Sequence, residues 1–294
     1  MNRLLALAAA TVLTLGATAC GERGEPLGAD VSPYPVTVQG AGDQATVVDA
    51  QPLRIAPLDA AMATLLIELD AQEQLVGLPR PGSSPSIWRL NGSALIRALA
   101  RLRPDLIVAS SSADPLDLAR AGRETKAAVY QIPEESVNDL ERGITQLALL
   151  TGHAVTGRTL VRANRRAERQ VEAALRAEPV LRVFLDTGGF TTVSTKTLIS
   201  DVIRIGHGRN VVGPRPEPGV FSLRRLARLD PQVYLTTDSS TTLRYLRSDR
   251  RTRRLAAVRT GRVHFVPARH LRPNGDIVER LLGIARILHP EAFR

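Results

Sequence analysis

The chain contains no set of residues whose types and spacing would support enzyme chemistry. It has no GxSxG nucleophile elbow, no GxxxxGKS/T phosphate-binding loop and no HExxH zinc helix. The glycine-rich segment 206–213, GHGRNVVG, follows a predicted helix instead of a strand and lacks the dinucleotide-binding spacing, so it indicates a turn. We therefore predict that the protein has no catalytic residues and is not an enzyme.

The residues that most often bind metal ions are equally dispersed. The five histidines are scattered without the ligand spacing of a zinc site: His153, His207, His264, His270 and His289. The only cysteine is Cys20. We predict no directly bound metal ion, no covalent cofactor and no internal disulfide.

Cys20 closes a segment that is typical of protein export. Arg3 precedes an apolar run from Leu4 to Leu15, which is shorter than the roughly 20 residues of a spanning helix and predicts a signal peptide over residues 1–19. The sequence ATAC that ends at Cys20 is similar to a bacterial lipobox, although Ala17 stands where Leu is usual. This similarity implies a diacylglycerol on the thiol of Cys20. An ordinary secretory signal with an accidental cysteine is the alternative.

The composition is that of a folded globular protein with aliphatic cores. Hydrophobic residues make up 44% of the chain and aromatic residues only 3%, so Leu, Val, Ile and Ala must fill the interior. The formal charge of +10 favours acidic partners such as anionic ligands, anionic lipids or nucleic acid. No RNA-recognition or zinc-finger pattern supports nucleic acid, and the arginines of helical segments indicate solvated faces.

The strongest structural signal is an internal repeat. Residues 97–112 read RALARLRPDLIVASSS, and residues 224–239 read RRLARLDPQVYLTTDS. Each copy predicts an amphipathic helix that ends before a proline, followed by a short apolar strand at 106–109 or 233–236. Each strand leads into Ser, Thr or Asp residues. Such positions hold ligands in α/β folds, although the same side chains could cap the following helices.

Further patterns complete two α/β lobes around these copies. We expect strands at 53–57, 181–186 and 262–267 and a helix at 197–205, with Asp59 as a candidate cap for a helix through Leu69. From about 154 to 177 no proline occurs and apolar residues recur three and four apart, which predicts a helix about 36 Å long. The predicted fold class is α/β, with two Rossmann-like lobes of mostly parallel sheets joined by one long α-helix.

This order of segments resembles the periplasmic binding proteins for ferric siderophores, heme and cobalamin, whose lobes are joined by a single long helix. The resemblance covers about Val47 to Phe293 and depends on passages such as LRPDLIVA, ITQLALLTG, IGHGRNVVG, LAAVRTGRVHFVPA and ERLLGIARILHPEAF. It implies a signal peptide over 1–19, a flexible tether over 20–46, an N-terminal lobe over 47–153, a bridging helix over 154–177 and a C-terminal lobe over 178–294.

The resemblance implies a ligand site on the loops at the strand ends of both lobes. The ligand-binding candidates are Asp59, Arg80, Trp88, Arg89, Ser110, Ser111, Phe190, Thr191, Asp238, Arg269, His270 and Arg272. Arginines suit an anionic chelate because their planar fork makes charge-assisted, often bidentate bonds to oxygen ligands. Trp88 could stack on a ring system, and a packed rim residue is the alternative.

One departure from the family concerns the contact with the permease. Members usually carry a surface glutamate at the start of the helix before the Pro-Asp strand motif of each lobe, and this chain has Arg97 and Arg224 there. Because like charges repel, a permease with the usual arginines would be a poor partner. The permease could carry compensating acids, docking could use other acids such as Glu68, Glu73 or Glu217, the alignment could be shifted by a turn, or delivery could be lost.

The resemblance therefore implies an exported, lipid-anchored substrate-binding protein of an ABC importer. Such a protein captures a metal chelate, for example a ferric siderophore or cobalamin, and delivers it to a permease dimer with its ATPase. A surface sensor that kept the fold but lost transport is the second hypothesis. The sequence does not name the chelate or decide between a periplasmic and a cell-surface setting.

Overall fold

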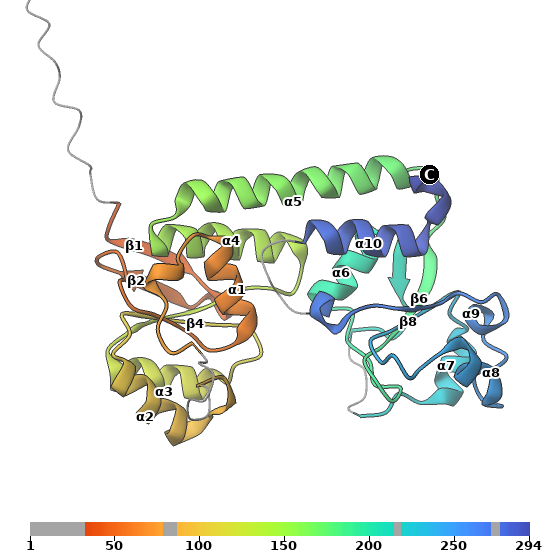
Figure 1. Cartoon of the computed structure of the whole chain (residues 1–294), viewed down its shortest axis with the longest axis horizontal. Helices are drawn as coiled ribbons and strands as arrows, with labels where there is room; N and C mark the ends of the chain where they lie inside the picture. The colour runs from red at the N-terminus through yellow and green to blue at the C-terminus, as the bar shows by residue number, and fades with distance from the viewer. Residues whose placement is uncertain (1–32, 79–86, 215–218, 272–276) are drawn as a thin grey trace, which may run out of the picture. The chain divides into compact units, whose positions relative to one another are not determined.

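The computed structural model describes residues 33–78, 87–214, 219–271 and 277–294. Residues Tyr34–Arg294 form one compact unit. Within this unit the chain builds two parallel sheets, one from the segments before the longest helix and one from the segments after it (Figure 1). The predicted mixed α/β class with mostly parallel sheets is therefore confirmed.

The N-terminal lobe contains a three-stranded parallel sheet in the order β3-β4-β5 and an antiparallel hairpin of β1 and β2. Its strands are β1 (Val36–Gln39), β2 (Ala45–Val48), β3 (Ile55–Pro57), β4 (Leu106–Ala109) and β5 (Ala128–Gln131). Its helices are α1 (Ala60–Glu68), α2 (Gly92–Leu102), α3 (Pro115–Thr125) and α4 (Val137–Thr151). Short 3-10 turns occur at Ala41–Asp43, Gln72–Gln74 and Ile87–Arg89.

The C-terminal lobe contains a four-stranded parallel sheet in the order β7-β6-β8-β9. Its strands are β6 (Leu181–Asp186), β7 (Gly208–Asn210), β8 (Val233–Thr236) and β9 (Val263–Phe265). Its helices are α6 (Leu198–Ile205), α7 (Leu223–Leu229), α8 (Leu243–Ser248), α9 (Ala256–Arg259) and α10 (Val278–Leu288). Two 3-10 turns lie at Ala268–Leu271 and Pro290–Phe293.

The central strands β4 and β8 are buried on both faces, which explains their mainly apolar sequences. In β4, Leu106 and Val108 belong to a core cluster shared by both lobes, while Ile107 points into a second cluster under α2 and α3. In β8, Leu235 faces the shared cluster and Tyr234 faces a third cluster under α7, α8 and α9. Parallel strands covered on both faces require this pattern.

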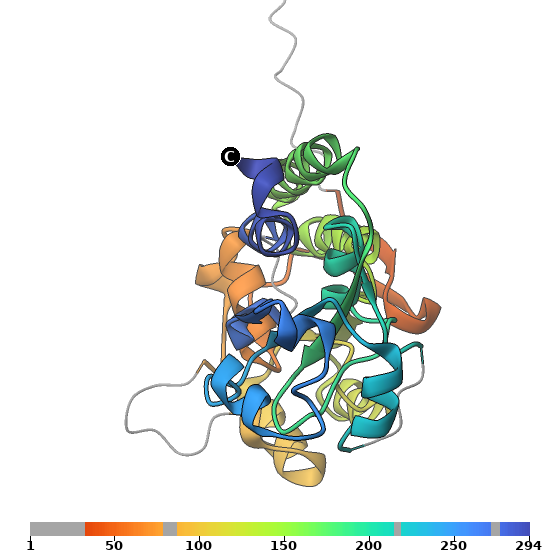
Figure 2. The ribbon, with the colours of Figure 1, turned by 90° about the vertical axis from the view of Figure 1, so that its right-hand side faces the viewer.

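The helix α5 (Ala154–Leu175) joins the lobes and packs on α4 near its start and on α10 near its end (Figures 1 and 2). Its buried stripe includes Val161, Ala167, Val171 and Leu175. A Cβ at Gly157 would collide with the Cβ of Ala148, so the close approach of α4 and α5 requires glycine there. Among the helices of the described part, none combines the length and hydropathy needed to span a bilayer.

The two repeat copies fold alike. The last helical turns of α2 and α7 end at residues in the left-handed region, Arg103 with φ 45° and Asp230 with φ 42°. The guanidinium of Arg54, just before β3, donates to the carbonyl oxygen of Leu102 at 2.7 Å, and that of Arg182 donates to the carbonyl oxygen of Asp230 at 3.0 Å. Arg54 therefore holds the C-terminal end of α2 against the start of β3, and Arg182 holds the C-terminal end of α7 against the start of β6.

The expected tether over residues 20–46 is too long. Val36 and Val38 are buried in the shared core cluster, and β1 pairs with β2, so the folded unit already includes this segment. The strands at 106–109, 181–186 and 233–236 have the predicted bounds, whereas the helix expected over 154–177 ends at Leu175.

Candidate functional site

Polar residues gather where β4 and β5 end. The backbone amide and the hydroxyl of Ser111 donate to the same oxygen of Glu134, Oε1, at 2.9 Å and 2.5 Å. The other carboxylate oxygen, Oε2, is buried and has no hydrogen-bond partner in the described part of the chain. Glu134 therefore offers one buried acceptor oxygen that only a further group can satisfy.

The surroundings of Glu134 raise the pKa of its carboxyl above the usual range. Burial raises the pKa of this carboxyl, the two bonds from Ser111 lower it, and the nearby Asp59 carboxylate raises it, with a net shift upward. A hydrogen-bond donor or a cation placed against Oε2 would relieve the cost of ionising this group.

Glu134 lines a pocket of about 170 Å³ that receives residues from both lobes. The N-terminal lobe contributes Ser111, Glu134 and Glu135, and the C-terminal lobe contributes Lys196, Thr197, Leu198 and Leu271. Whole small-molecule sites usually measure about 300–1,000 Å³, so this pocket fits one polar group of a larger ligand. The carboxyl ends of parallel strands are the usual ligand position in α/β sheets.

The lobes are also joined directly beside this pocket. The backbone amide of Val137, the first residue of α4, donates to Oδ2 of Asp201 on α6 at 2.9 Å. Asp201 in turn pairs with Arg204 at 2.7 Å. This bond links α4 of the N-terminal lobe to α6 of the C-terminal lobe.

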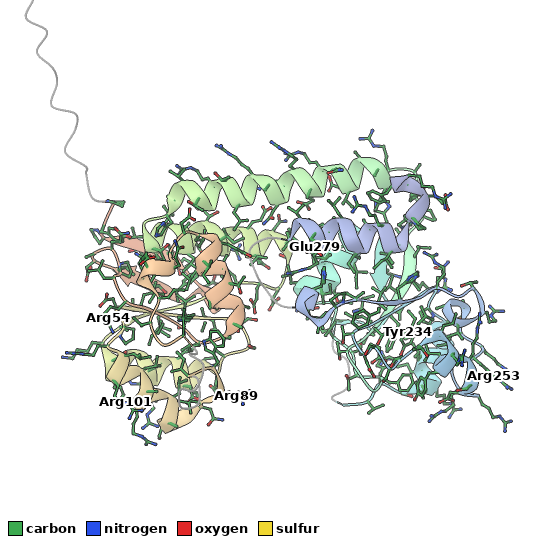
Figure 3. The ribbon with its side chains drawn as sticks, in the orientation of Figure 1. Arg54, Arg89, Arg101, Tyr234, Arg253 and Glu279 are labelled. Atoms are coloured by element: carbon green, nitrogen blue, oxygen red, sulfur yellow. The ribbon has the colours of Figure 1, made fainter. Side chains whose placement is uncertain are left out.

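A larger pocket of about 620 Å³ lies elsewhere, between the 3-10 turn at Ala268–Leu271 and α10. Only the C-terminal lobe lines it. His270 lies there, with Nε2 3.9 Å from Oε1 of Glu279 on α10 (Figure 3). The structure therefore does not bring His270 to the pocket of Glu134, and we take the smaller pocket as the site because both lobes and two strand ends contribute to it.

The loop after β6 is ordered by a buried acid. Oδ2 of Asp186 accepts from the hydroxyl of Tyr234 at 2.7 Å, and Oδ1 accepts from the amide of Gly188 at 2.9 Å. Thr191, a predicted ligand residue, shares a hydrogen bond with Thr187 at 2.8 Å. Phe190, also predicted to face the ligand, is only 9% exposed and belongs to the core cluster under α7–α9, so the structure gives its ring a packing role.

Three other predicted residues order strand ends. Asp59 caps α1 by accepting from the amide of Met62 at 2.9 Å, which confirms the predicted cap. Ser110 is buried, and its amide donates to the second oxygen of Asp59 at 3.4 Å. Asp238 accepts from the hydroxyl and amide of Ser240, and these bonds lower the pKa of the Asp238 carboxyl.

Trp88 and Arg89 lie on the 3-10 turn that precedes α2. The indole Nε1 of Trp88 donates to the carbonyl oxygen of Pro57, the last residue of β3, at 3.0 Å. Its ring is half-buried against the cluster under α2 and α3. Arg89 is exposed (Figure 3). The indole donor of Trp88 is therefore already used within the N-terminal lobe.

Several predicted residues lie outside the described residues: Cys20, Arg80, Arg272 and the side chain of Arg269. Of the four predicted cleft arginines, only Arg89 can be placed. The predicted docking positions, Arg97 on α2 and Arg224 on α7, are both exposed on equivalent helices of the two repeat copies. Where side chains are described, no three His, Cys, Asp or Glu residues converge as metal ligands would.

Comparisons with solved structures show the same fold at low sequence identity. CeuE of Helicobacter pylori with Ni(II) bound gives a TM-score of 0.73 at 16% identity, over 88% of this chain and 90% of that chain. MolA of Haemophilus influenzae bound to molybdate gives 0.73 at 16% identity, over 88% and 92%. The vitamin B12 binding protein BtuF of Vibrio cholerae gives 0.68 at 17% identity, over 83% and 98%.

No curated protein matches the sequence. A family model described as "Periplasmic binding protein" matches residues 92–270, which is more than half of the chain. The matched segment runs from α2 to the turn after β9 and includes both repeat copies and the bridging helix. This family consists of solute-binding proteins, which confirms the prediction that the chain is not an enzyme. The chain belongs to the periplasmic binding protein family.

Proposed function

We propose that this protein is the substrate-binding component of an ABC importer for a metal chelate, either a ferric siderophore or cobalamin. Membership in its family implies an extracytoplasmic location, a small-molecule ligand and a permease with an ATPase as partners. In this proposal the mature chain is anchored by a lipid on Cys20, binds the chelate between the lobes and releases it to the permease.

The observation that carries the proposal is the pocket around Glu134. It combines groups from both lobes, and one of its carboxylate oxygens lacks a partner among the described residues. Corrin side chains and many siderophores carry amide N–H groups, which are donors for such an oxygen. A bond from a donor to a buried carboxylate contributes about 1.5–3 kcal/mol, and it would form only when a ligand occupies the pocket.

The first test is a titration of the lipid-free chain from Gly21 onward with ferric siderophores, heme and cobalamin. Thermal stability reports binding, because a ligand that binds only the folded state raises the melting temperature. The fluorescence of Trp88, the only tryptophan, reports proximity to its rim position. Stabilisation by one chelate class supports the proposal. If no chelate raises the melting temperature, the importer role fails.

The second test concerns Glu134 itself. Glu134→Gln keeps the shape and the bonds from Ser111 but replaces the acceptor Oε2 by an amide N–H donor, so we expect about tenfold weaker binding of the chelate that stabilises the parent. Glu124→Gln makes the same change at an exposed position on α3 and should leave affinity within about twofold. Equal affinities for the parent and Glu134→Gln would exclude this pocket as the subsite.

A second candidate function is a sensor that no longer delivers its ligand. The exposed arginines at positions 97 and 224 favour it, because the resembling importers carry acids there. Reconstitution with the permease encoded beside this protein separates the two functions. Ligand-dependent ATP hydrolysis that is lost in Arg97→Glu with Arg224→Glu supports delivery through these positions, whereas binding without any stimulation supports the sensor.

A further inference from the structure

The charge of the protein is divided unequally between its lobes. Residues 178–294 contain 21 Lys and Arg against 10 Asp and Glu, whereas residues 47–153 contain 10 against 13. The excess positive charge of the whole chain therefore comes from the C-terminal lobe and the bridging helix. A lobe with this excess of positive charge attracts anionic partners over a distance set by the ionic strength.

Much of this charge lies on one short segment that includes α8 and α9. Seven exposed arginines between residues 244 and 259 form what we call the arginine face: Arg244, Arg247, Arg250, Arg251, Arg253, Arg254 and Arg259. Only Arg251 makes an ion pair there, with Asp249 at 2.8 Å. The other six carry no ion pair to any described residue.

The packing of the lobe turns these arginines outward. On the inner side of α7, α8 and α9, Leu226, Leu246, Leu255 and Val258 are buried in one cluster against the sheet. The arginines occupy the opposite side, and Arg253 lies at the outer edge of the lobe (Figure 3). Tyr245 lies among them with 46% of its surface exposed.

The arginine face suits an extended anionic surface better than a small ligand. None of the pockets described above is lined by its residues. Guanidinium groups bind phosphate oxygens with bidentate, charge-assisted bonds, and tyrosine is favoured at the interface between a membrane and water. An acidic protein partner would need a matching set of carboxylates spread over the same breadth, whereas a bilayer offers phosphates at every point.

We propose that the arginine face binds the surface of a bilayer that contains anionic phospholipids. This contact holds the C-terminal lobe against the membrane. The N-terminal lobe, which has more acidic than basic residues, then faces the solvent. The contact needs neither the ligand nor the lipid on Cys20, so a failure of chelate binding would leave it standing.

The test is co-sedimentation of the lipid-free chain from Gly21 onward, which retains every described residue, with vesicles. Vesicles of phosphatidylcholine alone are compared with vesicles that also contain phosphatidylglycerol. Each basic residue near an anionic surface contributes about fivefold to binding. The triple variant Arg247→Gln, Arg250→Gln, Arg254→Gln should therefore bind the anionic vesicles about 100-fold more weakly.

A matched control removes three charges elsewhere. Arg162→Gln, Arg166→Gln, Arg169→Gln on the exposed side of α5 lowers the net charge equally and should change binding by less than about threefold. The variant Arg247→Lys, Arg250→Lys, Arg254→Lys keeps the charge but loses the bidentate bonds, so it should bind more weakly than the parent and at least tenfold more tightly than the glutamine variant. Equal binding to both vesicle types would overturn the proposal, as would equal losses in the two glutamine variants. The second result would show that net charge, and not this face, governs binding.

Discussion

At the scale of single residues, the C-terminal lobe depends on a buried acid with a single side-chain donor. Asp186 is fully buried at the end of β6, and the hydroxyl of Tyr234 donates to its Oδ2. Burial raises the pKa of Asp186, while the bonds from Tyr234 and from backbone amides lower it. Tyr234 therefore offsets part of the cost of holding a carboxyl beneath the loop that carries Thr187 and Thr191.

Replacing Tyr234 by Phe should destabilise the fold by about 1–3 kcal/mol, because Oδ2 of Asp186 would lose its donor in a buried place. Urea unfolding followed by circular dichroism gives this free energy directly. Tyr245→Phe makes the same change at an exposed site on α8 and should stay within about 0.5 kcal/mol of the parent. Equal effects of the two variants would show that the bond to Asp186 contributes little.

The residues of the site were predictable only in part. The sequence predicts the cap at Asp59 and the polar ends of β4 and β8 because buried strands followed by hydroxyls form a readable pattern. Glu134 was missed because β5 was missed. Its segment AVYQ is half-buried at three of four positions and offers no apolar run. Without that strand, the sequence predicts that Glu134 and its neighbour Glu135 are both exposed. In the structure Glu134 packs against Ser111, and its Oε2 is buried.

At the scale of elements, the repeat predicts two equivalent helix ends, and in the structure they differ in the bonds that their last side chains make. Arg103 and Asp230 both adopt the left-handed region, which disfavours residues with a Cβ by about 1–2 kcal/mol. Asp230 also accepts from the amide of Ala256 at 2.7 Å, at the start of α9, whereas the side chain of Arg103 is exposed. The same strain is therefore compensated in one lobe only.

Replacement by glycine separates these two helix ends. Arg103→Gly should raise the free energy of unfolding by about 0.5 kcal/mol, because the strain relieved exceeds the entropy added to the unfolded chain. Asp230→Gly gains the same relief but loses the bond to Ala256, so it should be neutral or destabilising. Equal changes in urea unfolding would mean that the bond of Asp230 adds nothing to stability.

Elements buried on both faces were the most predictable. The strands β4, β6 and β8 have the predicted bounds because each is a mainly apolar or β-branched segment that follows shortly after a proline. The hairpin of β1 and β2 overlaps the segment predicted to be a tether, because its alternating Val36 and Val38 follow a stretch rich in Gly and Pro. Those valines are buried because β1 contacts α4 and β2 contacts β5, and neither contact can be predicted from the local sequence.

At the scale of the whole molecule, groups with opposite shifts set the response to pH. Burial raises the pKa of Asp186, Glu134 and Glu168. As the pH falls, these carboxyls therefore bind protons at a higher pH in the folded state than in the unfolded state, and this difference stabilises the fold. Burial lowers the pKa of His264 and His289 below 6.5, so acidification opposes folding through them.

His289 gives the last prediction, because its side chain is only 4% exposed and faces other titrating groups. Its Nδ1 lies 3.4 Å from Oε2 of Glu178, whose charge raises the pKa, and its ring lies 6.3 Å from that of His207, yet burial dominates and lowers it. The stability this neutral ring contributes is complete above about pH 6.5 and declines as the pH falls towards the folded-state pKa. His289→Gln cannot take up a proton, so between about pH 7.5 and 5.5 its free energy of unfolding should fall less steeply than that of the parent. The difference in slope corresponds to at most one proton, or about 1.4 kcal/mol per pH unit. His153→Gln makes the same change on the N-terminal lobe and is the control. If the parent and both variants showed the same dependence of unfolding free energy on pH in urea unfolding, His289 would not cause the loss of stability at acidic pH.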